Sequence, residues 1–134
     1  MRLLAVPEDD PLADADEVRL ADLEGRNVLL LDEGHCLRAQ TLPLCDAAGA
    51  GELGGFRASS LGTITQMVAS GLGITLLPEL AVEREAAAVP SLRAISFGAE
   101  GPSRQVGLAW RANSPRADEY RTLGETLATA YARS

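Results

Sequence analysis

SSLGTITQMVASGLGITLLP, residues 59–78, predicts a helix, a turn and a strand in direct succession. The helix has N-cap candidates in Ser59 and Ser60 and a glycine, Gly71, at its end. Apolar residues recur at three- and four-residue steps between them, at Leu61, Ile64, Met67 and Val68. Residues 74–77 are continuously apolar and stop at Pro78, as in a short buried strand. This unit is typical of an α/β fold.

The flanking sequence repeats the alternation of strand and helix. Strands are expected at 3–6, 28–31, 56–58, 92–97 and 105–111. Helical segments are expected at 21–25, 36–48 and 79–85, and from Pro115 to the end, where an apolar stripe contains Tyr120, Leu123, Leu127 and Tyr131. Pro43 should interrupt the 36–48 segment, and Trp110 is expected in the core. The alternation predicts a mainly parallel sheet flanked by helices.

Length, composition and net charge limit the classes of protein to which this chain can belong. A chain of 134 residues with 46% apolar residues is long enough for one globular domain. Its net charge of -7, with arginine as the sole basic side chain beside His35, argues against nucleic-acid binding by this segment alone. The apolar runs are too short to span a bilayer and no signal peptide is recognisable, so we expect a cytoplasmic protein with no membrane partner.

Residues 32–45, DEGHCLRAQTLPLC, hold both cysteines and the single histidine. On one continuous helix Cys36 and Cys45 would be about 13.5 Å apart along the axis, whereas a disulfide needs Cα atoms within about 7 Å. A disulfide would therefore require this segment to unwind, and Pro43 lowers the cost of unwinding. The pair is a candidate redox switch.

The two cysteines have unequal sequence contexts. Cys36 opens a helix, where free N–H groups and the helix dipole favour a thiolate, and His35 can assist it. Cys45 lies among apolar residues, as suits a resolving thiol. The alternatives are core cysteines that do no chemistry, a Cys-His hydrolase or thiol peroxidase, and a zinc site, for which the cysteine spacing is unfavourable. We expect no metal and no cofactor.

Two motifs make the chain resemble a known family. Residues 67–78 are similar to the helix, turn and strand of the effector-binding domain of LysR-type transcriptional regulators. Residues 34–38, with Gln40 and Cys45, resemble the peroxide-sensing members of that family, and similarity extends through 56–61 and 107–115. The resemblance implies a periplasmic-binding-protein-like (type 2) fold.

The same resemblance implies functional roles. Cys36 would match the thiol that hydrogen peroxide oxidises to a sulfenic acid, and Cys45 the thiol that condenses with it. His35 would match a histidine beside the peroxide, and Arg104 an arginine that supports the thiolate. The implied protein is a homodimer or tetramer that activates transcription through RNA polymerase, is reset by a cellular dithiol and is not an enzyme.

The resemblance also implies a larger protein. Residues 1–100 would form the second regulatory subdomain, and residues 101–134 a strand and helix returning to the first. DNA would be bound only through an N-terminal helix-turn-helix domain that this sequence lacks. Ala39 and Pro43 depart from the acidic and small residues frequent in the family. The alternatives are a metabolite-binding LysR domain and a free-standing thiol peroxidase.

Overall fold

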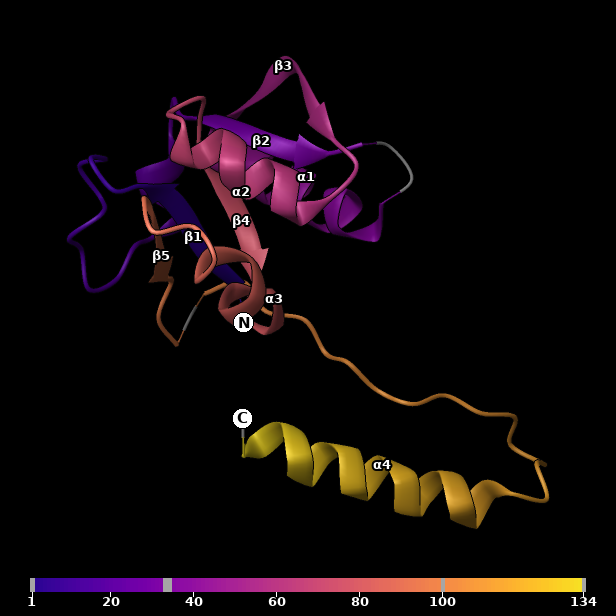
Figure 1. Ribbon diagram of the computed structural model, residues 1–134. Helices are drawn as coiled ribbons and strands as arrows, with labels where there is room; N and C mark the ends of the chain where they lie inside the picture. The colour runs from indigo at the N-terminus through magenta and orange to yellow at the C-terminus, as the bar shows by residue number, and fades with distance from the viewer. Residues whose placement is uncertain (1, 33–34, 100, 134) are drawn as a thin grey trace. The chain divides into compact units, whose positions relative to one another are not determined.

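The computed structural model describes residues 2–32, 35–99 and 101–133, which fall into two compact units, Met1–Ser103 and Arg104–Ser134 (Figure 1). Gly34, the first residue of the motif quoted above for the family resemblance, lies outside the described residues. The first unit contains five strands: β1 (Arg2–Pro7), β2 (Asn27–Leu31), β3 (Gly51–Ala58), β4 (Thr75–Pro78) and β5 (Leu92–Ser96). These confirm the first four expected strands together with the one at 74–77.

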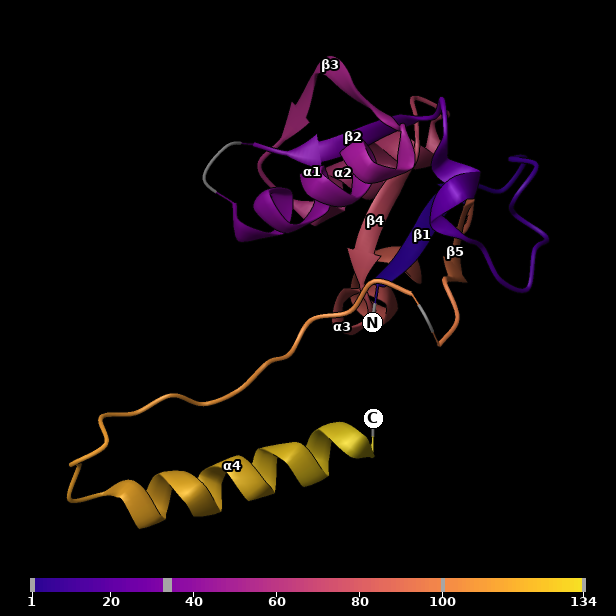
Figure 2. The same cartoon turned by 180° about the vertical axis from the view of Figure 1, so that it is seen from behind.

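The strands pair in two groups. β1 lies between β4 and β5 and pairs antiparallel with both (Figure 2), whereas β2 and β3 pair in parallel. A parallel bridge between Val28 and Ile74 links the two groups. The prediction of a mainly parallel sheet is therefore wrong for the three-stranded group. A continuous apolar run indicates that both faces of a strand are buried, but it does not indicate whether the neighbouring strands are parallel or antiparallel.

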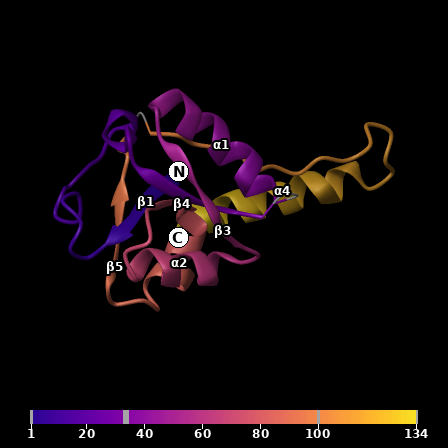
Figure 3. The same ribbon diagram turned by 90° about the horizontal axis from the view of Figure 1, so that it is seen from above.

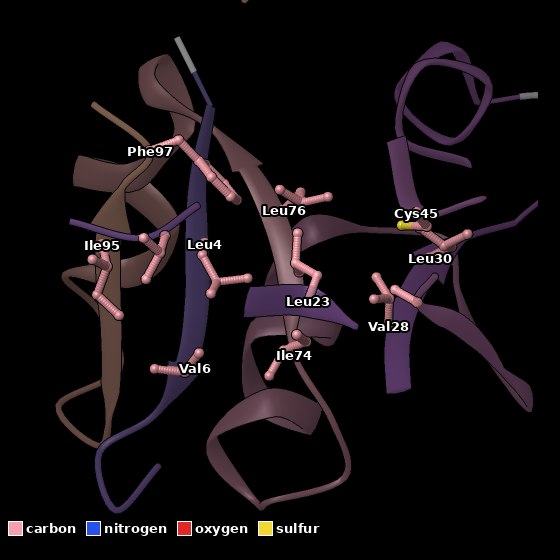
Figure 4. Close-up of a cluster of buried hydrophobic side chains, with 12 residues drawn as sticks. Leu4, Val6, Leu23, Val28, Leu30, Cys45, Ile74, Leu76, Ile95 and Phe97 are labelled. Carbon is pink, nitrogen blue, oxygen red and sulfur yellow. The ribbon is translucent and has the colours of Figure 1, made fainter. Parts of the chain in front are cut away.

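Both faces of the strands are covered by helices. α1 (Cys36–Ala48) and α2 (Leu61–Ala69) lie on opposite sides of the strands (Figure 3). Alternate residues of β2 point to the two sides. Val28 and Leu30 join the cluster that contains Cys45 (Figure 4), and Leu29 and Leu31 join the cluster around α2. This burial explains why residues 28–31 of β2 are all apolar.

α2 has the ends that its sequence predicts. The Ser60 hydroxyl accepts the Thr63 N–H at 3.2 Å, which makes Ser60 the N-cap. At the other end Gly71 has φ +84°, and the Leu72 N–H donates to the Met67 carbonyl at 3.2 Å. That pair of features is the Schellman arrangement that ends helices at glycine.

The remaining helical segments of the first unit are short. A 3-10 turn covers Leu20–Leu23, and α3 (Glu79–Ala81) continues into a π-helical turn, Val82–Ala86. They confirm the helical segments expected near 21–25 and 79–85. No helix of the described ranges has the length and apolarity needed to cross a membrane.

The second unit consists of an extended segment followed by α4 (Ala117–Ala132). The strand expected at 105–111 is absent among the described residues, because a strand requires a hydrogen-bonded neighbour and none pairs with this segment. Trp110 is 37% exposed and packs on Tyr120, with ring centroids 5.9 Å apart, so its assignment to the core was wrong. The predicted stripe on α4 is present, with Leu123, Leu127 and Tyr131 all exposed.

Candidate functional site

Helix α1 positions both cysteines. It begins at Cys36 and includes Pro43, so one helix spans the segment that the proline was expected to interrupt. Pro43 lacks an N–H, which removes the helical hydrogen bond to the carbonyl four residues earlier, at Ala39. At the C-terminal end Gly49 has φ +70°, and the Ala50 N–H donates to the Cys45 carbonyl at 2.9 Å. The helix thus ends at Gly49, with the Cys45 carbonyl satisfied at this end, and it lacks one hydrogen bond between the two thiols.

Cys36 and His35 stand at the exposed start of α1. Cys36 is the first helical residue and His35 is the N-cap, whose backbone carbonyl accepts the Arg38 N–H at 3.1 Å. Both residues are exposed, and Cys36 is a free thiol. The Cys36 thiol is therefore accessible to reagents, and it lies beside the first N–H groups of the helix, which have no acceptor within the helix.

Cys45 is in the opposite environment. Its side chain is 1% exposed and lies in the cluster with Val28 and Leu30 (Figure 4). Burial, together with the negative charge of Asp46, raises the pKa of the Cys45 thiol to about 11, while the Arg2 guanidinium acts in the opposite direction. Cys45 is therefore a protonated, protected thiol at neutral pH.

The structure places the two thiols on one helix, nine residues apart and both free. The rise along the axis between them is about 13.5 Å, about twice the Cα separation that a disulfide tolerates. The structure confirms the helix across both thiols; that a disulfide would require this helix to unwind stays a prediction.

A buried arginine holds the middle of α1. Arg2 on β1 is 4% exposed, and its guanidinium donates to the Thr41 hydroxyl at 2.9 Å and to the Gln40 side-chain carbonyl at 2.7 Å. The Thr41 hydroxyl in turn donates to the Leu37 carbonyl at 2.8 Å. The helix is therefore tied to the first strand between the two cysteines.

A second group of charges holds the start of α1. The Arg38 guanidinium donates to both Glu52 carboxylate oxygens, at 2.7 and 2.9 Å, and to the Leu31 carbonyl at 3.3 Å. Arg57 lies 3.3 Å from the same carboxylate. The hydrogen bonds from Arg38 lower the pKa of the Glu52 carboxyl, and the charge of Arg57 acts in the same direction.

A bulge in β3 creates this second group. Val28 pairs with Glu52, but Leu30 pairs with Arg57, so residues 53–56 loop out of the register. Gly55 within the loop has φ +84°, a conformation that favours glycine. The bulge brings Glu52 and Arg57 together at the edge of β2. Sequence reasoning missed these contacts and those of Arg2; the paired glycines at 54 and 55 were the available signal for a bulge.

Arg104, the fourth predicted site residue, is exposed and begins the second unit. Its role toward the thiolate stays a prediction. Within the described part of the chain, no three His, Cys, Asp or Glu side chains are grouped so that they could hold a metal ion.

Comparison with known proteins places the chain in a family. The LysR substrate binding domain matches residues 2–132. The chain is 46% identical over 127 residues to the DNA-binding transcriptional dual regulator OxyR of Escherichia coli K12, covering 93% of this chain and 41% of that protein. This chain therefore spans less than half the length of that relative.

Solved structures agree with the sequence match. The crystal structure of the reduced form of OxyR has a TM-score of 0.75 and 41% identity, over 92% of this chain and 57% of that one. The oxidised form of OxyR has a TM-score of 0.72 and 44% identity, over 92% and 58%. An H2O2-bound OxyR variant from Corynebacterium glutamicum has a TM-score of 0.85 and 33% identity, over 98% and 42%. The chain belongs to the LysR substrate-binding domain family.

Proposed function

We propose that this chain is the redox-sensing part of a peroxide-responsive LysR-type regulator, and that the Cys36 and Cys45 thiols are its sensor. The observation that carries the proposal is the arrangement on α1: one free thiol exposed at the helix start, the other buried near its end, with a proline between them. Relatives that match nearly the whole chain are hydrogen-peroxide-inducible activators, and OxyR has been solved in reduced and oxidised forms.

In the proposed reaction, two thiols and one hydrogen peroxide give one disulfide and two water molecules. The Cys36 thiolate attacks one peroxide oxygen, an S–O bond forms, the O–O bond breaks, and the departing hydroxide takes a proton and leaves as water. Cys45, exposed by unwinding of α1, loses its proton and attacks the Cys36 sulfur. A disulfide forms as the second water leaves. A cellular dithiol returns two electrons and two protons to restore both thiols.

His35 and Arg104 are assigned supporting roles. His35 adjoins Cys36 in the chain and is exposed with it, so its imidazole can donate a hydrogen bond to bound peroxide. Arg104 would supply positive charge to the thiolate, a role that rests on the family resemblance. No metal or cofactor is needed for either step.

The intact regulator would be larger than this chain. We assign residues 1–100 to the second subdomain of a type 2 periplasmic-binding-protein-like domain, and residues 101–134 to elements that complete the first. The exposed stripe of α4 supports this assignment, because an amphipathic helix normally buries its apolar face. Such a protein would act in the cytoplasm as a homodimer or tetramer, bind DNA through a separate domain and recruit RNA polymerase as an activator.

The test is stoichiometric oxidation. One equivalent of hydrogen peroxide should form an intramolecular Cys36–Cys45 disulfide in the purified full-length protein, seen as a loss of two mass units and a linked peptide pair. The Cys36→Ser variant should not react, and the Cys45→Ala variant should stop at the sulfenic acid, which dimedone traps. Two free thiols after treatment that oxidises a control thiol protein would refute the proposal.

Two other outcomes separate the alternatives. Sustained consumption of peroxide in the presence of a dithiol would identify a thiol peroxidase. A metabolite that raises the melting temperature of a protein with serine at both cysteine positions would identify a metabolite sensor.

A further inference from the structure

The ion-paired group of Arg38, Glu52 and Arg57 joins the two segments that oxidation would separate. Arg38 lies on the first turn of α1, two residues after Cys36, and Glu52 lies on β3. If Cys45 is to reach Cys36, α1 must unwind between them. The residues of that first turn then change position relative to β3, which is paired in parallel with β2.

The contact between Arg38 and Glu52 fixes the orientation of the two side chains as well as pairing their charges. Arg38 binds Glu52 in a two-oxygen fork at 2.7 and 2.9 Å, and the two side chains are only 12% and 22% exposed. Forked arginine–carboxylate pairs fix orientation and are stronger than single hydrogen bonds between neutral groups. Arg57 lies on the other side of the β3 bulge from Glu52, and its Nε is 3.3 Å from a Glu52 carboxylate oxygen.

We propose that Arg38 is a positioning residue of the switch, and that its fork with Glu52 is a catch that keeps α1 helical and sets how fast Cys45 reaches oxidised Cys36. This rests on the proposed function. The catch acts on the condensation step: sulfenic acid formation at exposed Cys36 does not require the helix to open.

The experiment measures opening of α1 without relying on thiol chemistry. In a Cys36→Ser background, hydrogen–deuterium exchange of the amides of residues 37–42, 44 and 45 is compared for the parent and for Glu52→Gln. Loss of the fork should speed exchange of these amides about fivefold to tenfold. The Asp10→Asn variant is the matched control, because it breaks the partly buried Arg26–Asp10 pair, which involves no residue of α1. It should leave exchange in α1 unchanged.

A second measurement links the catch to the switch. In the protein with both cysteines, Glu52→Gln should speed disulfide formation by a similar factor while the rate of sulfenic acid formation, followed by dimedone trapping in the Cys45→Ala background, stays the same. Arg38→Lys keeps the charge but loses the fork, and should give an intermediate increase. Arg38→Lys also provides a test of the proposal if the Glu52→Gln protein does not fold.

The outcomes separate the two proposals. Unchanged exchange in α1 for Glu52→Gln, or an equal increase for Asp10→Asn, would overturn the catch whether or not a disulfide forms. Faster exchange in Glu52→Gln combined with no disulfide in the parent would uphold the catch as a restraint on α1 and overturn the redox function it was proposed to serve.

Discussion

At the scale of single residues, the two cysteines differ through their surroundings alone. Cys36 is exposed at a helix start, whereas Cys45 is packed among Val28 and Leu30. The chemical identity of the thiols is the same. The proposed division between an attacking and a resolving cysteine therefore rests on burial and on position on α1.

Alkylation should report this difference directly. At pH 8 a thiol with the Cys45 pKa of about 11 is about one-thousandth thiolate, and burial restricts access as well. We expect iodoacetamide to label Cys36 at least about 100-fold faster than Cys45 in the folded protein, by mass spectrometry of the peptides. In urea the two rates should converge. Similar rates in the folded protein would contradict the assigned burial.

Pro43 is the residue at which α1 is weakest. Proline inside a helix costs about 3 kcal/mol relative to alanine, and the Pro43 side chain is exposed, so little packing is lost by replacing it. Pro43→Ala restores an N–H that can reach the Ala39 carbonyl. The substitution should raise the free energy of unfolding by about 1 to 3 kcal/mol and slow disulfide formation about tenfold or more.

The check combines urea unfolding of the reduced protein with a time course of disulfide formation. Pro90→Ala is the matched control, because Pro90 is exposed and lies outside every helix and strand. Faster disulfide formation in Pro43→Ala would show that the proline does not assist unwinding.

At the scale of elements, α1 is held to the strands at two places, by Arg2 on β1 and by Glu52 on β3. The pKa of the Glu52 carboxyl is lowered by its bonds to Arg38, so the folded state binds this proton less tightly than the unfolded state. The resulting stability is complete above the ordinary carboxyl pKa of about 4.3 and disappears as pH falls through the lowered folded-state pKa.

Glu52→Gln should therefore destabilise the protein by about 1 kcal/mol at pH 7. The difference from the parent should shrink as pH falls below about 4, because the parent carboxyl then becomes protonated too. Urea unfolding at pH 7, 5 and 3 measures this. A constant difference at all three pH values would mean that Glu52 contributes through packing and not through its charge.

Local patterns predicted most elements of the first unit. Helix α2, with its Ser60 cap and Gly71 end, follows directly from side-chain periodicity and backbone preference. The direction of β1 and the bulge in β3 did not follow, since both depend on which strand lies alongside. The exposed segment 105–111 has the apolar content of a strand, but strand formation requires a pairing partner.

At the scale of the whole molecule, the second unit leaves an apolar surface uncovered. Leu123, Leu127 and Tyr131 are 47%, 50% and 53% exposed on one side of α4. Three- and four-residue spacing places them on the same helix face, and such a stripe normally packs against another element.

The 134-residue chain should therefore self-associate. Light scattering coupled to gel filtration should show a mass above that of a monomer at high concentration, and Leu127→Glu should shift the equilibrium toward monomer. Leu80→Glu is the control, since Leu80 is at least as exposed as Leu127 but lies on α3 in the first unit. A monodisperse monomer at high concentration would contradict this expectation.

Residue types and their spacing were enough to predict the alternation of strands and helices in the first unit, the ends of α2, and a helical segment over residues 36–48, although not that it continues through Pro43. These properties depend on local backbone preference and on apolar periodicity, which a sequence displays directly. The tertiary structure alone revealed that Cys45 is buried, that Arg2 and Glu52 hold α1, and that β1 runs against its neighbours. Each of these depends on which distant segments meet, and that is settled by packing of the whole chain.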